Sequence, residues 1–394
     1  MMSKNTHCHS VSTQTMPETT AKIPKLVSPT GDEYPSCHSL AVLPYDLIWE
    51  ILLRVPVRSL ILFKCVCKSW KTLISDPQFA KDHLCISTAD PNMTHQRIVA
   101  RHHRDILSFS VQSLLQNPSN PAKPHSWRMS HKYCIVGSCN GLLCLSRFKH
   151  GYCRLRLWNP CTGLKSKRLS IGFYPVDITF HGLGYDHVNH RYKLLAGVVD
   201  YFETQTKIYS FGSDSSTLIQ NQNLPREPIR MQGKFVSGTL NWIIEKGTSD
   251  DHQWVILSLD MVTETFGEVF LPKCVEDSEK ICHPILGVSR DCLFVCFLDS
   301  KKAHWSVLMM KEYGVRDSWT KLLMTPHISI FRTQYLYPLF ETLRISENGV
   351  VLLRTRTNLL LYNSNDGWLV YPRIRRKLGF DMHIYHESLV SPKS

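Results

Sequence analysis

Short β-like runs that recur about every fifty residues constrain the fold of this chain more than any other feature. Apolar runs that end in a turn finish at positions 160, 211, 260, 311 and 363, with steps of 49 to 52 residues. A second series consists of two-residue turns that feed apolar runs, and their second residues stand at 141, 190, 238, 291 and 349. Two series in phase at this spacing are typical of a β-propeller with kelch-sized blades.

Five such units are visible, and the sequence predicts a propeller-like domain over residues 131–390. Residues 87–130 are interpreted as a linker or as the first elements of a blade. The segment 90–135 and the C-terminal run Phe380–Leu389 either supply a sixth blade or close the ring, and the pattern leaves both open. An irregular β domain or a pair of β-sandwiches is the alternative to a propeller.

A small helical module is predicted over residues 41–86, after a leader of residues 1–40 that is rich in Ser, Thr, Pro and His. Pro44 suits the first turn of a helix, and Pro56 ends it. Ser59 is a plausible N-cap of a second helix that runs to Ile74, and a short third helix is expected through Phe79. The leader lacks apolar periodicity, so we expect it to be disordered.

The helical module carries more apolar residues than two short helices can hide from each other. The apolar stripe of each helix follows steps of three and four residues. Several apolar residues fall off these stripes, namely Leu47, Trp49, Ile61, Leu62, Val66 and Leu73. Such a surplus favours a docking partner, while packing on the rest of the chain is the alternative.

The run from Leu43 to Ile74 resembles an F-box, with its Leu-Pro start, its VPVRSL centre and its CVCKSW block. F-box modules dock on the Skp-type adaptor of SCF-type (cullin–RING) ubiquitin ligases. The resemblance assigns adaptor contacts to nine residues: Leu43, Pro44, Ile48, Leu52, Val55, Pro56, Leu60, Val66 and Trp70.

The β region resembles the F-box-associated interaction domain that accompanies plant F-boxes. The phrases that carry the resemblance are GSCNGL from Gly137, LWNP from Leu157, GLGYD from Gly182, FVSGTLNW from Phe235, MKEYGV from Met310 and the closing Glu387-Ser388-Leu389. The expected fold class is therefore α+β multidomain, with a small three-helix F-box followed by an all-β, propeller-like domain.

Together the two resemblances imply a non-catalytic substrate-recognition subunit of an SCF-type ubiquitin ligase. The F-box would dock the adaptor, and through it the cullin, while the β domain would recruit a target protein for ubiquitination. A propeller scaffold outside ubiquitin transfer is the alternative. No cofactor is expected. Because the leader has no apolar signal core and no run of 18 apolar residues occurs, we expect the cytoplasm or nucleus and no membrane partner.

The positive charge of the chain is concentrated in one segment. The formal net charge is +13, and residues 91–170 hold thirteen Lys and Arg against Asp105 alone. A solvated surface is the plain interpretation. The alternative is a positive sector, extended by Arg373, Arg375, Arg376 and Lys377, that recruits an acidic or phosphorylated target. Its candidate residues are Arg154, Arg156, Lys165 and Lys167. Nucleic-acid binding through residues 91–170 is less favoured, because residues 171–344 have a net charge of −3 and aromatic interleaving is lacking.

No catalytic or metal-binding constellation stands out. Gly137-Ser138-Cys139-Asn140-Gly141 fits a nucleophile elbow formally, but the apolar run after it indicates a strand rather than a helix, so Asn140-Gly141 is interpreted as a hairpin turn. The fourteen cysteines show no paired zinc spacing and are interpreted as reduced thiols. Among them, Cys65, Cys67, Cys292 and Cys296 are expected to be small core residues.

Overall fold

The computed structural model describes most of the chain after the leader. The described residues are 43–90, 92–149, 152–171, 178–200, 203–213, 215–219, 231–248, 251–272, 275, 281–299, 304–326, 341–346, 348–355, 358–374, 378–379 and 381–393. The chain divides into two compact units, Met1–Pro44 and Tyr45–Ser394. The predicted leader lies outside the described residues, as do Arg375, Arg376, Lys377 and Phe380.

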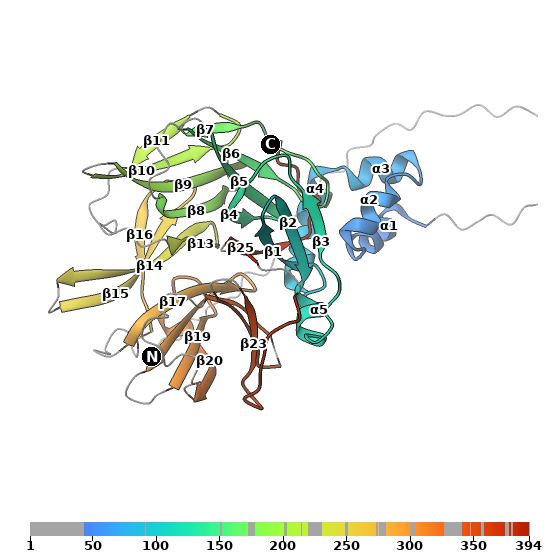
Figure 1. The fold of residues 1–394 in the computed structure, drawn as a ribbon. Coiled ribbons are helices and arrows are strands. Elements are labelled where there is room, and N and C mark those ends of the chain that lie inside the picture. The colour runs from blue at the N-terminus through green and yellow to red at the C-terminus, as the bar shows by residue number, and fades with distance from the viewer. Residues whose placement is uncertain are drawn as a thin grey trace, which may run out of the picture. The chain divides into compact units, whose positions relative to one another are not determined.

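The second unit begins with four helices (Figure 1), which are α1 (Tyr45–Leu53), α2 (Val57–Phe63), α3 (Lys68–Ile74) and α4 (Pro77–Ala89). Pro56 precedes α2 with ψ at 141°, which separates it from α1. The Asp76 carboxylate caps α4 by accepting from the backbone N–H groups of Gln78 at 2.6 Å and Phe79 at 3.3 Å. Such caps satisfy amide groups that have no partner inside the helix.

The single helix predicted from Ser59 to Ile74 is in fact two helices. The N–H groups of Cys65 and Val66 donate to the carbonyls of Leu62 and Phe63, three residues back, which tightens the end of α2. Cys67 is then extended, with φ −155° and ψ 168°, and its sulfur accepts from the Trp70 N–H as the cap of α3. Cys65 and Cys67 are therefore exposed in this turn and are not core residues as predicted.

Six sheets follow, and we number them as blades 1 to 6 (Figure 1). Blade 1 contains β25 (Met382–His386), β1 (Gln96–His102), β2 (Asp105–Ser110) and β3 (His125–Arg128), with α5 (Val111–Gln116) after β2. Blade 2 contains β4 (Cys134–Cys139), β5 (Leu142–Lys149), β6 (Tyr152–Trp158) and β7 (Leu169–Ile171). Blade 3 contains β8 (Ile178–Asp186), β9 (Arg191–Asp200), β10 (Glu203–Ser210), β11 (Ser216–Ile219) and β12 (Met231–Gln232), which pairs in parallel with β8.

Blades 4 to 6 have four strands each. Blade 4 contains β13 (Lys234–Val236), β14 (Thr239–Thr248), β15 (Asp251–Asp260) and β16 (Phe266–Val269). Blade 5 contains β17 (Ile281–Ser289), β18 (Cys292–Asp299), β19 (His304–Met310) and β20 (Trp319–Pro326), with the 3₁₀ helix η1 (Arg316–Ser318) before β20. Blade 6 contains β21 (Glu341–Ile345), β22 (Val350–Arg354), β23 (Leu359–Asn363) and β24 (Leu369–Val370).

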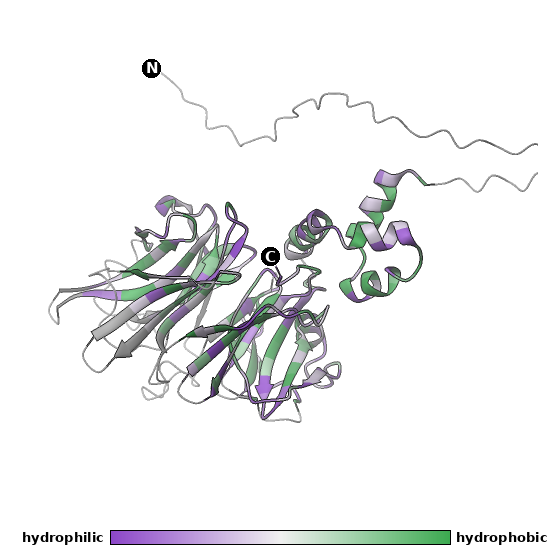
Figure 2. Cartoon of the chain, turned by 90° about the horizontal axis from the view of Figure 1, so that it is seen from above, coloured by the Kyte–Doolittle hydropathy of each residue, from purple (hydrophilic) through white to green (hydrophobic). Residues whose placement is uncertain are grey.

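The ring is closed by the two ends of the blade region. The C-terminal strand β25 pairs antiparallel with β1, so blade 1 combines residues from both ends of the blade region. Hydrophobic clusters of buried residues lie between each pair of neighbouring blades, from blades 1 and 2 round to blades 6 and 1. Figure 2 shows many apolar residues along these strands, and a strand such as β23 is buried on both faces because its blade packs between two others. The predicted propeller is thus confirmed, with six blades.

The two sequence series mark fixed places in the blade. The turns at Asn140-Gly141, Ser237-Gly238 and Arg290-Asp291 join the first and second strands of blades 2, 4 and 5, and both residues of each turn have positive φ. The series of apolar runs that end in a turn marks the end of the third strand in blades 2 to 6. In the helices of the described residues, no segment is both long and apolar enough to cross a bilayer.

Candidate functional site

Exposed apolar side chains lie on α1, on α2 and in the turn between α2 and α3. Tyr45, Leu47 and Ile51 lie on α1, and Leu47 and Ile51 share a face at a spacing of four residues. On α2 and the turn after it, Leu62 is 70% exposed and Val66 is 63% exposed. We call these five residues the apolar helical face. Large apolar side chains this exposed in a small helical unit are typical of a protein interface.

Basic side chains lie beside Val66 in the sequence. Lys68 and Lys71 are exposed on α3, and burial together with repulsion from Lys71 lowers the pKa of Lys64. Lys64 and Lys71 therefore lie close enough for electrostatic repulsion between them. A partner that covers this region gains from apolar contact and from acidic groups.

The nine predicted adaptor contacts divide into three groups by their exposure. Leu52 and Leu60 are buried in the core of the helical unit, so they support the module rather than reach a partner directly. Ile48, Val55 and Trp70 pack partly against the same core. The exposed members of the set are Leu43, Pro44, Pro56 and Val66. Tyr45 and Ile51 were not predicted to be exposed, whereas Leu47, Leu62 and Val66 belong to the predicted off-stripe apolar surplus.

The C-terminal segment 387–390 joins the helices to the blades. Leu389 is 7% exposed and belongs to the same apolar cluster as Leu52, Leu60 and Phe79. The side-chain amide of Asn159 donates to the carbonyls of Ser388 at 3.0 Å and Val390 at 2.8 Å. The core of the helical unit is therefore completed by residues more than three hundred positions later in the chain.

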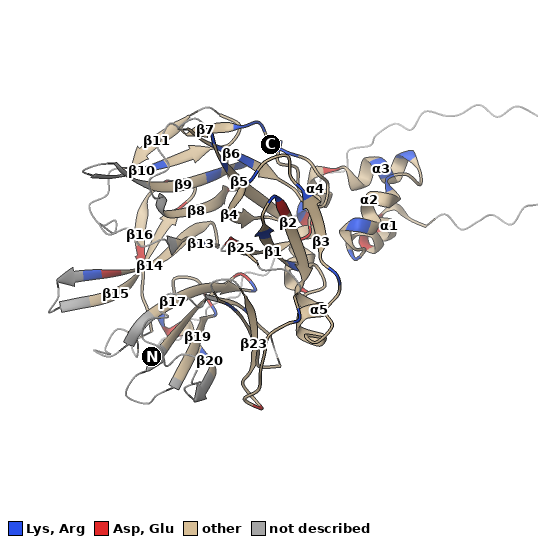
Figure 3. Cartoon of the chain, viewed as in Figure 1, with Lys and Arg blue, Asp and Glu red and all other residues tan. Residues whose placement is uncertain are grey.

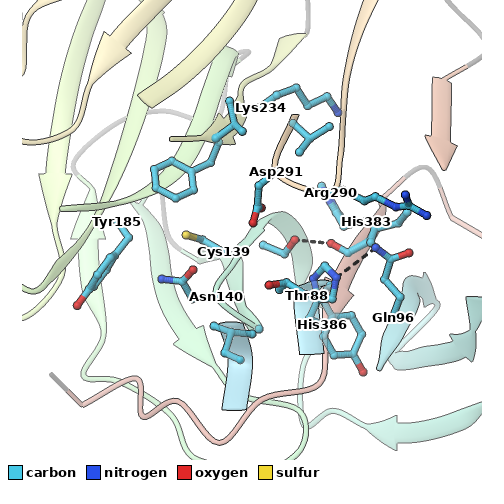
Figure 4. Close-up of a pocket in the computed structure, with 18 of the residues that line it drawn as sticks. Thr88, Gln96, Cys139, Asn140, Tyr185, Lys234, Arg290, Asp291, His383 and His386 are labelled. Carbon is cyan, nitrogen blue, oxygen red and sulfur yellow. Dashed lines mark hydrogen bonds between the residues drawn. The ribbon is translucent and has the colours of Figure 1, made fainter. Parts of the chain in front are cut away.

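A cavity of about 620 Å³ lies where the inner strands of the blades meet α4 (Figure 4). Lys81 and Thr88 of α4, Cys139 at the end of β4, and Arg290 and Asp291 of the β17–β18 turn are among its lining residues. A cavity of this volume at the centre of a ring is a common place for a ligand or a peptide segment.

Two histidines of β25, His383 and His386, line the cavity and have hydrogen-bond partners. The His383 ring is bonded on both sides, to the Ile135 carbonyl at 3.0 Å and to the Gln232 side-chain amide at 2.9 Å. His386 Nε2 lies 3.2 Å from Gln96 Nε2 (Figure 4). Burial, and then the charges of Arg344 and His95, lower the pKa of His386 to about 4. His386 is therefore neutral at neutral pH.

The cavity does not turn Cys139 into a nucleophile. Cys139 is buried at the end of β4, and a hairpin turn rather than a helix follows it. Burial raises the pKa of the Cys139 thiol, so the reactive thiolate is disfavoured. In the part of the chain that the structure describes, no group of three or more His, Cys, Asp or Glu side chains is arranged to hold a metal ion.

The structure brings two of the four predicted target-binding residues together. Arg154 and Arg156 lie on one face of β6, and Arg156 Nε donates to the Ser166 carbonyl at 2.9 Å. Lys165 and Lys167 are exposed in the segment that leads to β7, on either side of the buried Ser166. Arg373, a proposed neighbour of this sector, donates its backbone N–H to the Pro118 carbonyl, just beyond α5 in blade 1.

Comparison with known proteins places both parts of the chain. Residues 40–82 match the F-box domain, and residues 95–366 match the F-box associated beta propeller domain. The F-box/kelch-repeat protein At3g23880 of Arabidopsis thaliana is 33% identical over 89% of this chain and 96% of its own length. The F-box protein CPR1 of the same plant is 28% identical over 72% of this chain and 73% of its own length.

Similarity to solved structures is weaker. TolB from Acinetobacter baumannii is 8% identical, with a TM-score of 0.43 over 76% of this chain and 69% of that chain. The two domain matches follow one another in the chain, and together they span the helical unit and most of the blades. The chain belongs to the family of F-box proteins that carry an F-box-associated β-propeller.

Proposed function

We propose that this protein is a substrate receptor of an SCF-type ubiquitin ligase. Its F-box would bind a Skp-type adaptor, and through it a cullin, while its propeller would hold a target protein. The observation that supports this most is the apolar helical face, which remains exposed although the core of the helical unit is already closed with the help of Leu389. An F-box with a free apolar face and a separate ring of blades has the parts that a receptor needs.

The receptor would accelerate ubiquitin transfer without bond chemistry of its own. Holding the target near the conjugating enzyme raises the effective concentration of its lysines and limits their orientations. The segment 387–390 supports this role, because it ties the helices to the blades through Leu389 and Asn159. A firm junction would keep the target at a defined distance from the docked adaptor.

Co-purification with a Skp-type adaptor tests the proposal. We expect the wild-type protein to retain the adaptor and the double variant Leu43→Ala/Pro44→Ala to lose most of it. A variant with Val188→Glu is the matched control, because Val188 is also an exposed apolar residue but lies in the β8–β9 turn. Full adaptor retention by the double variant would favour a propeller scaffold outside ubiquitin transfer.

A further inference from the structure

One face of blade 2 carries a row of basic side chains from three segments. Arg147 of β5 lies directly opposite Arg154 of β6, and Lys149 lies opposite Tyr152. Because side chains alternate across a strand, these four side chains share one face of the hairpin. Arg168 directly precedes β7, whose Ser170 pairs with Arg154.

A histidine of the same region shows how close these cations lie to one another. The pKa of His131 is lowered, first by partial desolvation and then by the positive charges of Arg147, Arg104, Lys149 and Arg168. Arg104 belongs to the turn between β1 and β2, so blade 1 adds a cation to those of blade 2. We call Arg104, Arg147, Lys149, Arg154 and Arg168 the basic face. Figure 3 shows Lys and Arg concentrated on β5, β6 and the segment before β7.

Within the described residues, the cations of the basic face are not paired with carboxylates. Among the described residues, no ion pair forms with any of its five cations, while the nearby Arg128 lies 3.9 Å from the Asp105 carboxylate. Like charges directly opposite each other on neighbouring strands, as at Arg147 and Arg154, destabilise a sheet. An anionic partner would relieve this repulsion.

The composition of the basic face indicates which anion fits. Four of its five cations are arginines, whose planar guanidinium groups bind phosphate and carboxylate through paired hydrogen bonds. Tyr152 is 55% exposed on the same face and offers one ring for apolar contact. Single-stranded nucleic acid is bound by successive stacking rings along a basic groove, and this face supplies one such ring. A short peptide that carries several phosphates fits better.

We propose that the basic face binds a phosphorylated, acidic segment of the target protein. This inference rests on the proposed function only in taking the bound protein to be a target of the ligase, since the binding itself needs no adaptor. This proposal changes the set of target-binding residues that was predicted from the sequence. Arg154 remains in the set, and Arg156 contributes mainly to the fold through its bond to Ser166. The residues added to the set are Arg104, Arg147, Lys149 and Arg168.

Fluorescence anisotropy with the full chain tests the proposal. The probe is a labelled twelve-residue peptide with three phosphoserines among aspartates, and the same peptide without phosphate is the comparison. We expect the wild-type protein to bind the phosphopeptide at least ten times more tightly than its unphosphorylated form, with affinity that falls as salt rises. Arg147→Gln/Arg154→Gln should weaken binding at least tenfold, and the conservative Arg154→Lys should weaken it less.

The charge-matched control is Lys311→Gln/Lys321→Gln, which removes two exposed cations from blade 5. This control should bind the phosphopeptide like the wild type. Melting temperatures at or above the wild-type value would show that the Gln variants fold, and Arg147→Gln/Arg154→Gln should melt slightly higher because like-charge repulsion is removed.

Wild-type binding that is absent, or that survives in Arg147→Gln/Arg154→Gln, would overturn the proposal. Tighter binding of a twenty-nucleotide oligouridine that competes with the peptide would overturn it in favour of nucleic acid. Adaptor co-purification is measured separately, so a protein that fails to bind the adaptor yet binds the phosphopeptide would contradict only the proposed ligase role.

Discussion

Glu387 Oε1 lies 3.5 Å from Nε of Arg58, so a residue that follows the last strand pairs with one on helix α2. The same oxygen lies 3.4 Å from Nη1 of Arg97 on β1. Glu387 is largely buried, whereas Arg58 is about half exposed. One carboxylate therefore links the F-box to the strand on which the ring closes.

Glu387→Gln should destabilise the protein by about 1–3 kcal/mol, because the largely buried Arg97 and the half-exposed Arg58 lose their shared counter-charge. Arg58→Gln should cost about 1 kcal/mol or less, since an exposed partner is screened by water. Chemical denaturation of both variants measures the difference. An equal loss in the two variants would contradict the buried position assigned to Glu387.

Leu389→Ala should destabilise the F-box helices, although Leu389 is distant from them in sequence. The deleted methyl groups leave a cavity in the cluster with Leu52 and Phe79, at a cost of about 2–5 kcal/mol. Hydrogen exchange should rise in α1 to α4. The matched variant Leu353→Ala opens a cavity between blades 5 and 6 and should leave exchange in these helices unchanged. Equal exchange in the helices of both variants would exclude a special role for Leu389.

Lys193 holds two carboxylates of blades 3 and 4 together. Its Nζ lies 2.8 Å from Asp186 Oδ2 and 2.8 Å from Glu264 Oε1, and both Lys193 and Asp186 are buried. Lys193→Met should destabilise the protein by about 3–5 kcal/mol, because the buried Asp186 would keep only its hydrogen bonds from Val188 and Asn189 and would lose its counter-charge. Lys193→Met/Asp186→Asn should recover part of the loss. Thermal unfolding of the two variants checks this order.

His386 should make the ring sensitive to acid. Its pKa of about 4 in the folded state lies below the ordinary value of about 6.5, so the unfolded chain binds the proton more readily. Stability should therefore fall as the pH drops from about 6.5 to about 4, by up to about 3 kcal/mol from this group. His386→Gln should flatten this part of the pH profile. An unchanged slope in the variant would assign the acid sensitivity to other groups.

The sequence predicted the ring well because each blade repeats a local requirement. The turns at Asn140-Gly141 and Arg290-Asp291 reverse the chain through positive φ values, which recur at the same place in each of blades 2 to 6 and can be predicted from turn residues. Blade 1 does not show this turn in the sequence, because its inner strand, β25, is the last strand described in the chain and no short turn joins it to β1. Neither its sheet partner nor its turn is local in sequence.

The parts of the site that were not predicted depend on register and long-range packing. The pairing of Arg147 with Arg154 follows from the length of the β5–β6 hairpin, which spacing of charges alone does not fix. The break between α2 and α3 depends on an extended Cys67, a residue with a weak capping preference. Leu389 enters the F-box core through tertiary packing, which leaves no periodic trace in the sequence.

The affinity of the purified protein for a purified Skp-type adaptor tests the central claim most directly. Isothermal titration calorimetry should give a one-to-one complex for the wild type and for the control Val188→Glu. Ile51→Glu, which places a charge on the 52% exposed Ile51 of the apolar helical face, should weaken binding at least tenfold. No complex with the wild-type protein, or wild-type affinity in Ile51→Glu, would contradict the account.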